Sequence, residues 1–168
     1  CQKILLLART TPREECRRRL DGLTLFLADL DPRYTEICEI PKLGRNAVNS
    51  NEVYIHDLPV SKNDVVGEVG RGFQQQMQQF QDERLIACIM TNEGSELLWE
   101  ITKKYCEERI LFGKPLSKMQ VTQFKFVEMM TQIAAAKELT YACVRKRLKD
   151  EDATREISMA KIFSGRMS

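Results

Sequence analysis

Residues 70–116 read GRGFQQQMQQFQDERLIACIMTNEGSELLWEITKKYCEERILFGKPL, and the spacing of apolar residues changes where this stretch begins. Upstream, short apolar runs are typical of strands. From Phe73 onward, apolar residues recur at intervals of three and four, which is typical of an amphipathic helix. Gly113 and Pro115 are expected to end this helix, as glycine followed by proline commonly does. The stretch therefore predicts a sheet region followed by long helices.

Four strands are expected upstream of this stretch. They are rich in β-branched and apolar residues, and clusters of turn-forming residues separate them. The expected strands cover residues 3–8, 23–27, 37–40 and 52–56. Because the connections are short, the pattern favours an antiparallel or meandering sheet over β-α-β units.

Three helices are expected downstream. The apolar stripe of the first is expected to continue through Leu97, Leu98, Ile101 and Tyr105 toward Phe112. The second covers about residues 117–148 and should have neighbours on two sides. The third begins near Asp152 or Thr154. Its inward-facing residues are expected to be Ile157, Ala160, Phe163 and Met167.

These patterns predict an α+β fold with two parts. Residues 1–66 are expected to form part of an antiparallel β domain, and residues 67–168 a truncated up-and-down helical bundle. Because the chain starts at a cysteine and stops inside a helical pattern, we interpret it as an excerpt of a longer polypeptide.

The composition is that of an ordinary globular protein. The 168 residues are 43% hydrophobic and 30% charged, and the net charge of +2 is too small to indicate a nucleic-acid partner. No apolar run reaches the roughly 18 residues of a membrane span. The six cysteines form no Cys-x-x-Cys pair, and with a single histidine they predict structural thiols rather than a metal site.

Two further patterns suggest phosphate binding, but each has a simpler interpretation. The glycines at 67, 70 and 72 lack the spacing of a dinucleotide-binding loop and the Lys-Ser/Thr of a P-loop, so a flexible corner between sheet and helix is favoured. The arginines between residues 9 and 19 are interleaved with acidic residues, so a solvated loop is favoured.

The run Asp82-Glu83-Arg84 allows two interpretations. Acidic residues in a first helical turn stabilise the helix by complementing its dipole. Alternatively, Glu83 is a general base whose basicity rises when an apolar ligand displaces water from it, and Arg84 holds the carboxylate in place.

Several segments together resemble one family, the acyl-CoA dehydrogenases, and the match covers essentially the whole chain. The order and spacing of the segments carry the resemblance more than any single motif does. The segments are residues 41–45, 51–60, 66–68, 70–73, 83–85 and 109–116.

The resemblance implies an FAD-dependent oxidoreductase that converts acyl-CoA thioesters to 2-enoyl-CoA in fatty acid β-oxidation. A glutamate takes the α proton, the β hydrogen leaves as hydride to the flavin, and the electrons pass to an electron-transfer flavoprotein. The family is typically a homotetramer, a dimer of dimers, found in the mitochondrial matrix of eukaryotes or the cytoplasm of bacteria. The alternatives are an acyl-CoA oxidase that uses oxygen and a non-catalytic scaffold of the same fold.

The resemblance also assigns roles to residues. Glu83 matches the base of isovaleryl and long-chain members, whereas most of the family carries its base in a later segment. The substrate-binding candidates are Gln81, Asp82 and Arg84, with Gln81 where medium-chain-type enzymes have an aspartate. The FAD-binding candidates are Arg109, Leu111, Phe112 and Gln120, of which Arg109 matches an arginine that reaches the flavin of a neighbouring subunit. The isolated excerpt is expected to bind FAD poorly and to be inactive.

Overall fold

The computed structural model describes residues 2–168. It divides into two compact units, Cys1–Met77 and Gln78–Ser168. Helix α1 (Gly72–Glu108) begins in the first unit and continues through the second. The order of elements, strands first and long helices after them, confirms the predicted α+β fold.

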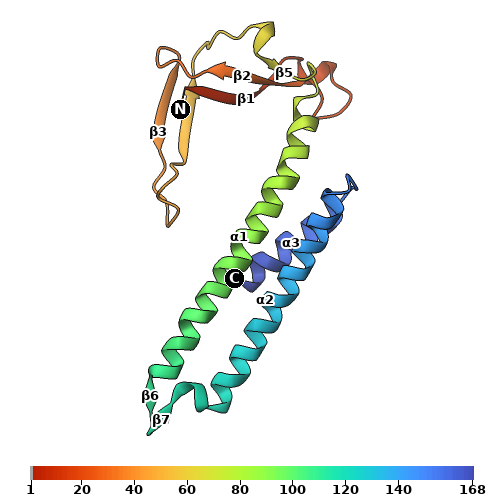
Figure 1. Cartoon of the computed structure of the whole chain (residues 1–168). Coiled ribbons are helices and arrows are strands. Elements are labelled where there is room, and N and C mark those ends of the chain that lie inside the picture. Colours follow the sequence, from red (N-terminus) through yellow and green to blue (C-terminus); the bar gives the residue numbers. More distant parts are fainter. Residues whose placement is uncertain (1) are drawn as a thin grey trace. The chain divides into compact units, whose positions relative to one another are not determined.

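The first unit contains two small antiparallel sheets (Figure 1). One has the order β1-β2-β5, and β3 pairs with β4 in the other. The strands are β1 (Lys3–Arg9), β2 (Leu23–Asp29), β3 (Thr35–Glu39), β4 (Asn51–Ile55) and β5 (Val65–Val66). The four predicted strands are confirmed to within two residues at each end. Strand β5 escaped prediction because two residues carry no alternation to detect.

Strand β2 forms the centre of the first unit because it has a neighbour on each edge. Leu25, Phe26 and Ala28 are buried there. Buried Thr24 connects this strand to the loops, since its Oγ1 accepts a hydrogen bond from the Gly70 amide at 2.9 Å and lies 2.7 Å from the Thr10 hydroxyl. The Gly70 amide, in the corner between the sheet and α1, thus has a side chain of β2 as its hydrogen-bond acceptor.

The start of α1 lies directly against β2. A Cβ atom added at Gly72 would lie 2.5 Å from the amide nitrogen of Leu25 and 2.7 Å from the carbonyl carbon of Thr24. Gly70 has a φ of +79°, in the left-handed region. These two positions require glycine for reasons of space and conformation, which supports the interpretation of the glycine cluster as a structural corner.

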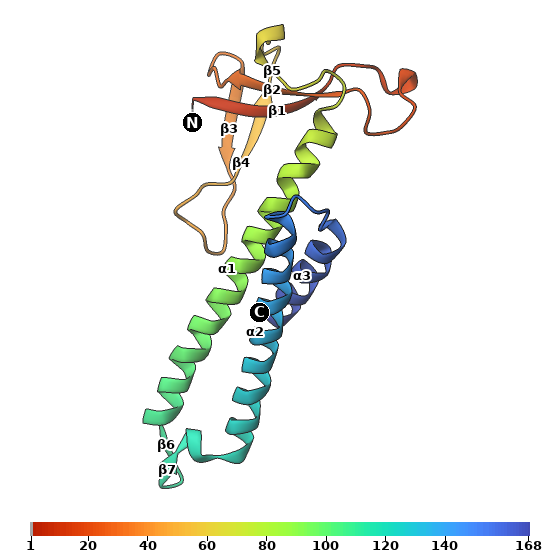
Figure 2. The ribbon, with the colours of Figure 1, turned by 45° about the vertical axis from the view of Figure 1, so that its right-hand side comes forward.

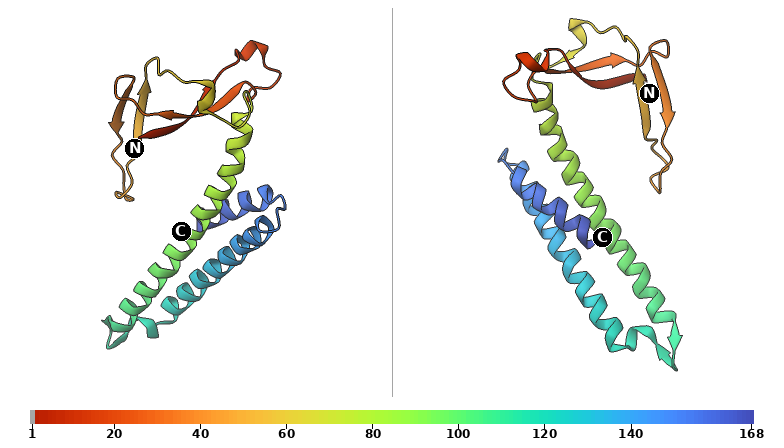
Figure 3. Two further views of the ribbon diagram at one scale, coloured as in Figure 1. Left: turned by 45° about the horizontal axis from the view of Figure 1, so that its top comes forward. Right: turned by 180° about the vertical axis from the view of Figure 1, so that it is seen from behind.

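The helices of the second unit are α1 from Gln78 onward, α2 (Gln120–Arg147) and α3 (Thr154–Met167). Helices α1 and α2 run side by side in opposite directions, and α3 turns back along α2 (Figures 2 and 3). The prediction that α1 continues to Phe112 was wrong. It ends at Glu108, and a hairpin of β6 (Ile110–Leu111) and β7 (Lys114–Pro115) follows. Single-turn 3₁₀ helices cover Arg13–Glu15, Lys62–Asp64 and Leu116–Lys118.

Small residues dominate the core of the second unit, where α3 packs closely against α2. The core residues are Leu85, Cys88, Cys143, Ala153, Ile157 and Ala160. The predicted burial of Ile157 and Ala160 is confirmed. Phe163 is 38% exposed, and Ser164 is buried in its place because residues 157, 160 and 164 follow the helical spacing of one face.

Polar side chains cross-link α1 to α2 within this unit. Asn92 Nδ2 donates to Thr140 Oγ1 at 2.9 Å, and both side chains are fully buried. Lys137 Nζ lies 2.5 Å from Glu96 and 2.9 Å from Glu93. Hydrogen bonds to Glu96 and then Glu93 raise the pKa of Lys137, so it stays charged at any ordinary pH. These contacts set the register between the two helices.

The Gly72 contact generates a stability prediction. Gly72→Ala should lower the stability of the full-length protein by about 1–3 kcal/mol, because the new methyl group overlaps the backbone of β2. Gly94→Ala in the same helix is the matched control: its Cβ would meet no atom within 4 Å, so it should stabilise by about 0.5–1 kcal/mol. Thermal unfolding measures both, and equal effects of the two substitutions would contradict the close approach.

Candidate functional site

Glu83 lies well inside α1 rather than at its start. The helix begins at Gly72, so Glu83 comes about three turns later. The interpretation that Asp82 and Glu83 complement the dipole of a first helical turn was therefore wrong, since the dipole acts mainly on the terminal turn. The role of Glu83 is therefore inferred from the exposure and the contacts of its side chain.

The Glu83 carboxylate is exposed. Its Oε1 accepts a hydrogen bond from Gln79 Nε2 at 3.1 Å, one turn earlier on the same helix. Successive helical residues are rotated by about 100°, so Glu83 points roughly opposite to the buried face that carries Leu85 and Cys88. It is oriented by Gln79 and open to a ligand on the side of α1 away from the bundle core.

Gln81 lies on the buried face instead. Together with Leu85, Cys88 and Asn92 it follows the i, i+4, i+7, i+11 spacing of one helical face, and it is 7% exposed. Its Oε1 is buried and accepts no hydrogen bond from any residue in the range 2–168. The structure does not bring Gln81 and Glu83 to the same side of the helix, and substrate binding by Gln81 stays a prediction.

Asp82 is held by a residue that the sequence did not single out. Arg147, the last residue of α2, donates from Nε to Asp82 Oδ1 at 3.0 Å and from Nη2 to Oδ2 at 3.2 Å. Such two-pronged pairs fix orientation as well as distance. Arg84, on another side of α1, is half-buried. Substrate contacts of Asp82 and Arg84 stay predictions, while the ion pair of Asp82 is a structural feature.

The hairpin after α1 has a strained turn. Phe112 and Gly113 both have positive φ angles, +50° and +79°, as a two-residue type I′ turn requires. A phenylalanine seldom adopts this conformation, and its ring is 89% exposed. Strained backbone that presents an exposed aromatic ring is a feature often associated with function.

The four FAD-binding candidates gather at this end of the second unit. Arg109 follows the last residue of α1, Leu111 and Phe112 belong to the hairpin, and Gln120 is the first residue of α2. All four are exposed. A guanidinium, an aromatic ring and an amide suit a dinucleotide, because they can meet a diphosphate, a flat ring and a polar group respectively. The side chains present therefore fit such a group chemically.

The two sets of candidates are far apart on one helix. Glu83 and Arg109 are separated by 26 positions, and at 1.5 Å per residue this corresponds to about 39 Å. That is more than the roughly 30 Å diameter of a small domain. One copy of the chain does not bring Glu83 and Arg109 together in a single site.

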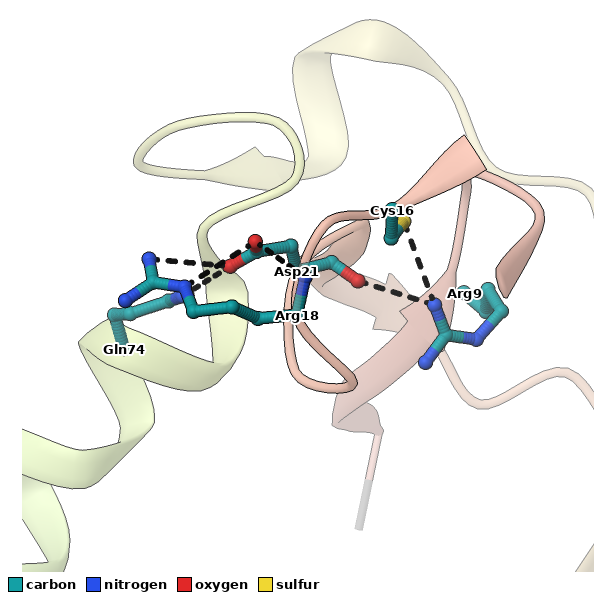
Figure 4. A network of polar contacts seen from close by, with 5 residues as sticks. All are labelled: Arg9, Cys16, Arg18, Asp21 and Gln74. Atoms are coloured by element: carbon teal, nitrogen blue, oxygen red, sulfur yellow. Dashed lines mark hydrogen bonds and ion pairs between the residues drawn. The ribbon is translucent and has the colours of Figure 1, made fainter. Parts of the chain in front are cut away.

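The arginine-rich loop of the first unit is braced from within (Figure 4). Arg9 donates to the carbonyl oxygens of Arg19 and Asp21, each at 3.1 Å. Arg18 forms an ion pair with Asp21, whose Oδ1 also accepts from Gln74 Nε2 at 3.2 Å. These guanidinium groups serve the loop itself, which supports the interpretation of a surface loop over a phosphate site.

The buried thiols are unsuited to nucleophilic chemistry. Burial raises the pKa of Cys88 and, together with the neighbouring Cys88, that of Cys143, so both remain protonated near neutral pH. Both belong to the core of the second unit. The prediction of structural thiols agrees with this environment.

The apolar stripe of α1 is not covered as expected. Leu97, Leu98, Ile101 and Tyr105 are each more than half exposed. A cavity of about 480 Å³ lies between α1, α2 and the end of α3, lined by Leu98, Trp99, Met129, Met167 and others. Within the described residues 2–168, no helix is long and apolar enough to cross a membrane.

Comparisons with known proteins agree with this architecture. Residues 70–168 match the family model described as "Acyl-CoA dehydrogenase, C-terminal domain". The mitochondrial long-chain specific acyl-CoA dehydrogenase of Sus scrofa is 28% identical over 158 residues, which cover 91% of this chain and 36% of that enzyme. The short-chain specific enzyme of Megasphaera elsdenii is 30% identical over 141 residues, covering 83% and 37%.

Solved structures give the same result. The crystal structure of an acyl-CoA dehydrogenase from Geobacillus kaustophilus superimposes with a TM-score of 0.92 at 28% identity, covering 99% of this chain and 43% of that one. The chain thus spans well under half the length of the relatives it matches. It belongs to the acyl-CoA dehydrogenase family, and it corresponds to the end of the middle β domain and part of the C-terminal helical domain.

The strained turn generates a second prediction. Phe112→Asn should raise stability by about 1 kcal/mol, because asparagine tolerates the left-handed conformation better and the exposed ring has little packing to lose. Phe124→Asn is the control: this ring is also exposed, but its backbone is helical, so no gain is expected. A lower melting temperature for Phe112→Asn would show that the ring packs against the protein.

Proposed function

We propose that this chain is part of an FAD-dependent acyl-CoA dehydrogenase that converts acyl-CoA thioesters to 2-enoyl-CoA, with Glu83 as the general base. One observation carries the proposal. Glu83 is an exposed, oriented carboxylate on the outer side of α1, at the position where the long-chain and isovaleryl members resembled by this chain carry their base.

Glu83 would accept the proton that leaves the α carbon of the thioester. Gln79 donates to Oε1, which orients the carboxylate and leaves Oε2 to receive the proton. An acyl chain laid along this side of α1 would displace water, and exposed Ile86 lies one turn further on to contact it. Removing water makes a carboxylate a stronger base toward a carbon acid.

Arg109, Phe112 and Gln120 are the residues that would hold FAD. Bound FAD supplies the acceptor for the hydride that leaves the β carbon. The Arg109 guanidinium would neutralise diphosphate charge, and the turn at Phe112 and Gly113 would present the ring from a fixed backbone. A ligand that contacts the Phe112 ring would explain why phenylalanine occupies a strained position in this turn.

The distance along α1 implies that these residues serve different active sites. With about 39 Å between Glu83 and Arg109, an arginine that contacts flavin would do so in the site of a second copy. The exposed apolar stripe of α1 is available for such association. This supports a homo-oligomer, which we propose to be the dimer of dimers typical of the family.

The remaining assignments follow the family. We propose acyl-CoA of unspecified chain length as substrate, an electron-transfer flavoprotein as acceptor and a role in fatty acid β-oxidation. The compartment would be the mitochondrial matrix in a eukaryote and the cytoplasm in a bacterium. The relative from Sus scrofa is a mitochondrial long-chain specific enzyme.

Substitution of the base tests the proposal in the full-length enzyme. Glu83→Gln should lower kcat by about a hundredfold or more with a panel of acyl-CoA substrates, because the amide cannot accept the α proton. The matched control is Glu100→Gln, an exposed glutamate further along the same helix, which should leave kcat unchanged. Near-normal turnover of Glu83→Gln would move the base to another segment of the enzyme.

Mixed oligomers test whether Glu83 of one copy and Arg109 of another contribute to the same active site. Arg109→Ala should lose bound flavin and Glu83→Gln should lose turnover. Co-expressed, the two should recover about one quarter of wild-type activity, since half of randomly formed dimers are mixed and each mixed dimer has one intact site. Activity per subunit measures this recovery, and flavin absorbance measures how many sites retain the cofactor. No recovery would place both residues in the same subunit's site.

A further inference from the structure

Asp82 and Glu83 are neighbours in sequence, but their carboxylates have different surroundings. Glu83 is open to solvent, whereas both oxygens of Asp82 bind the Nε–Nη2 edge of the Arg147 guanidinium, with Arg147 Nη2 also 2.9 Å from Oδ1. The two partners are 65 residues apart and belong to different helices. The pair therefore connects the turn of α1 that carries Glu83 to the far end of α2.

Arg147 extends from a well-defined corner between α2 and α3. Its own carbonyl accepts from the Asp150 amide at 3.1 Å, and the Lys146 carbonyl accepts from Glu151 at 3.1 Å. Lys146 Nζ pairs with Glu156 of α3 at 2.5 Å. Because the backbone on both sides of this corner is hydrogen-bonded, the guanidinium is presented to α1 from a fixed point.

The Asp82 contact lies nearer the start of α1 than the cross-links to α2 at Asn92, Glu93 and Glu96. Asn92, Glu93 and Glu96 hold the middle of α1 through Thr140 and Lys137. These contacts begin about two and a half turns after Glu83. Near Glu83, the packing of Leu85 and Cys88 supplies contact area but little directional restraint, since apolar contacts are non-directional.

We propose that Arg147 is a positioning residue, which through its two-pronged ion pair with Asp82 fixes the rotation of the helical turn that carries Glu83. This rests on the proposed function, in which Glu83 is the base. A base has to meet the α carbon within a narrow range of distance and direction, and misplacement by about 1 Å can cost about a hundredfold in rate.

Because the Asp82–Arg147 pair is partly exposed, its effect on the orientation of Glu83 can be measured apart from its effect on folding stability. The side chains of Arg147 and Asp82 are 37% and 55% exposed, and exposed ion pairs add little to folding stability. Loss of the pair should therefore leave the melting temperature nearly unchanged while the turn carrying Glu83 becomes less well oriented. In kinetic terms kcat should fall and KM should change little.

The experiment uses the full-length enzyme and five variants. Arg147→Ala and Asp82→Asn should each lower kcat about tenfold with KM changed less than about twofold. Arg147→Lys should fall between these and wild type, since an ammonium lacks the planar fork. The exchange variant, Asp82→Arg with Arg147→Asp, should recover most of kcat. Arg145→Ala is the control, because it removes another exposed arginine that pairs within α2, and it should have no effect.

The outcomes separate the two proposals. If Glu83→Gln abolishes turnover but Arg147→Ala and Asp82→Asn leave kcat unchanged, only the positioning role is overturned. The same conclusion follows if the single variants lower kcat and the melting temperature together and the exchange variant restores neither. If Glu83→Gln turns over normally, both the base and its positioning residue are overturned.

Discussion

The second unit depends on the contact between α1 and α2. Cys88 and Cys143 are buried in the core that the helices share, and the buried Asn92–Thr140 hydrogen bond sets the register of α1 against α2. A helix of 37 residues gains most of its stability from packing of this kind. Because α1 is one continuous helix, the turn that carries Glu83 and the end that leads to the hairpin stay about 39 Å apart, and on this ground we propose that the candidate residues serve two sites.

Regular elements with strong periodicity could be predicted from the sequence. Apolar and β-branched runs between turn-forming residues marked the four longer strands, and the three- and four-residue spacing marked all three helices, including the buried positions 157 and 160. The hairpin after α1 could not be predicted in the same way. Its strands have two residues each, and its turn places Phe112 in a conformation for which phenylalanine carries no signal.

The candidate site was predictable only in part. Glu83 was found through resemblance, and the structure adds that it is exposed and oriented by Gln79. Periodicity identified the apolar stripe of α1, yet it cannot say which element covers an apolar face, and residues such as Leu97 are exposed. Arg147 could not be predicted as the partner of Asp82, because a contact over 65 residues leaves no local pattern in the sequence.

The four residues from Gln81 to Arg84 show why a polar run on a helix is not a single site. Each successive side chain is rotated by about 100°, so Gln81 enters the bundle core, Asp82 meets α2, Glu83 faces outward and Arg84 lies on a fourth side. The exposed Asp82 carboxylate is held by Arg147 of α2, whereas the exposed Glu83 carboxylate is oriented by Gln79 of its own helix. The chemistry of Glu83 is therefore separable from the packing of its neighbours, while its direction still depends on the helix that those neighbours hold.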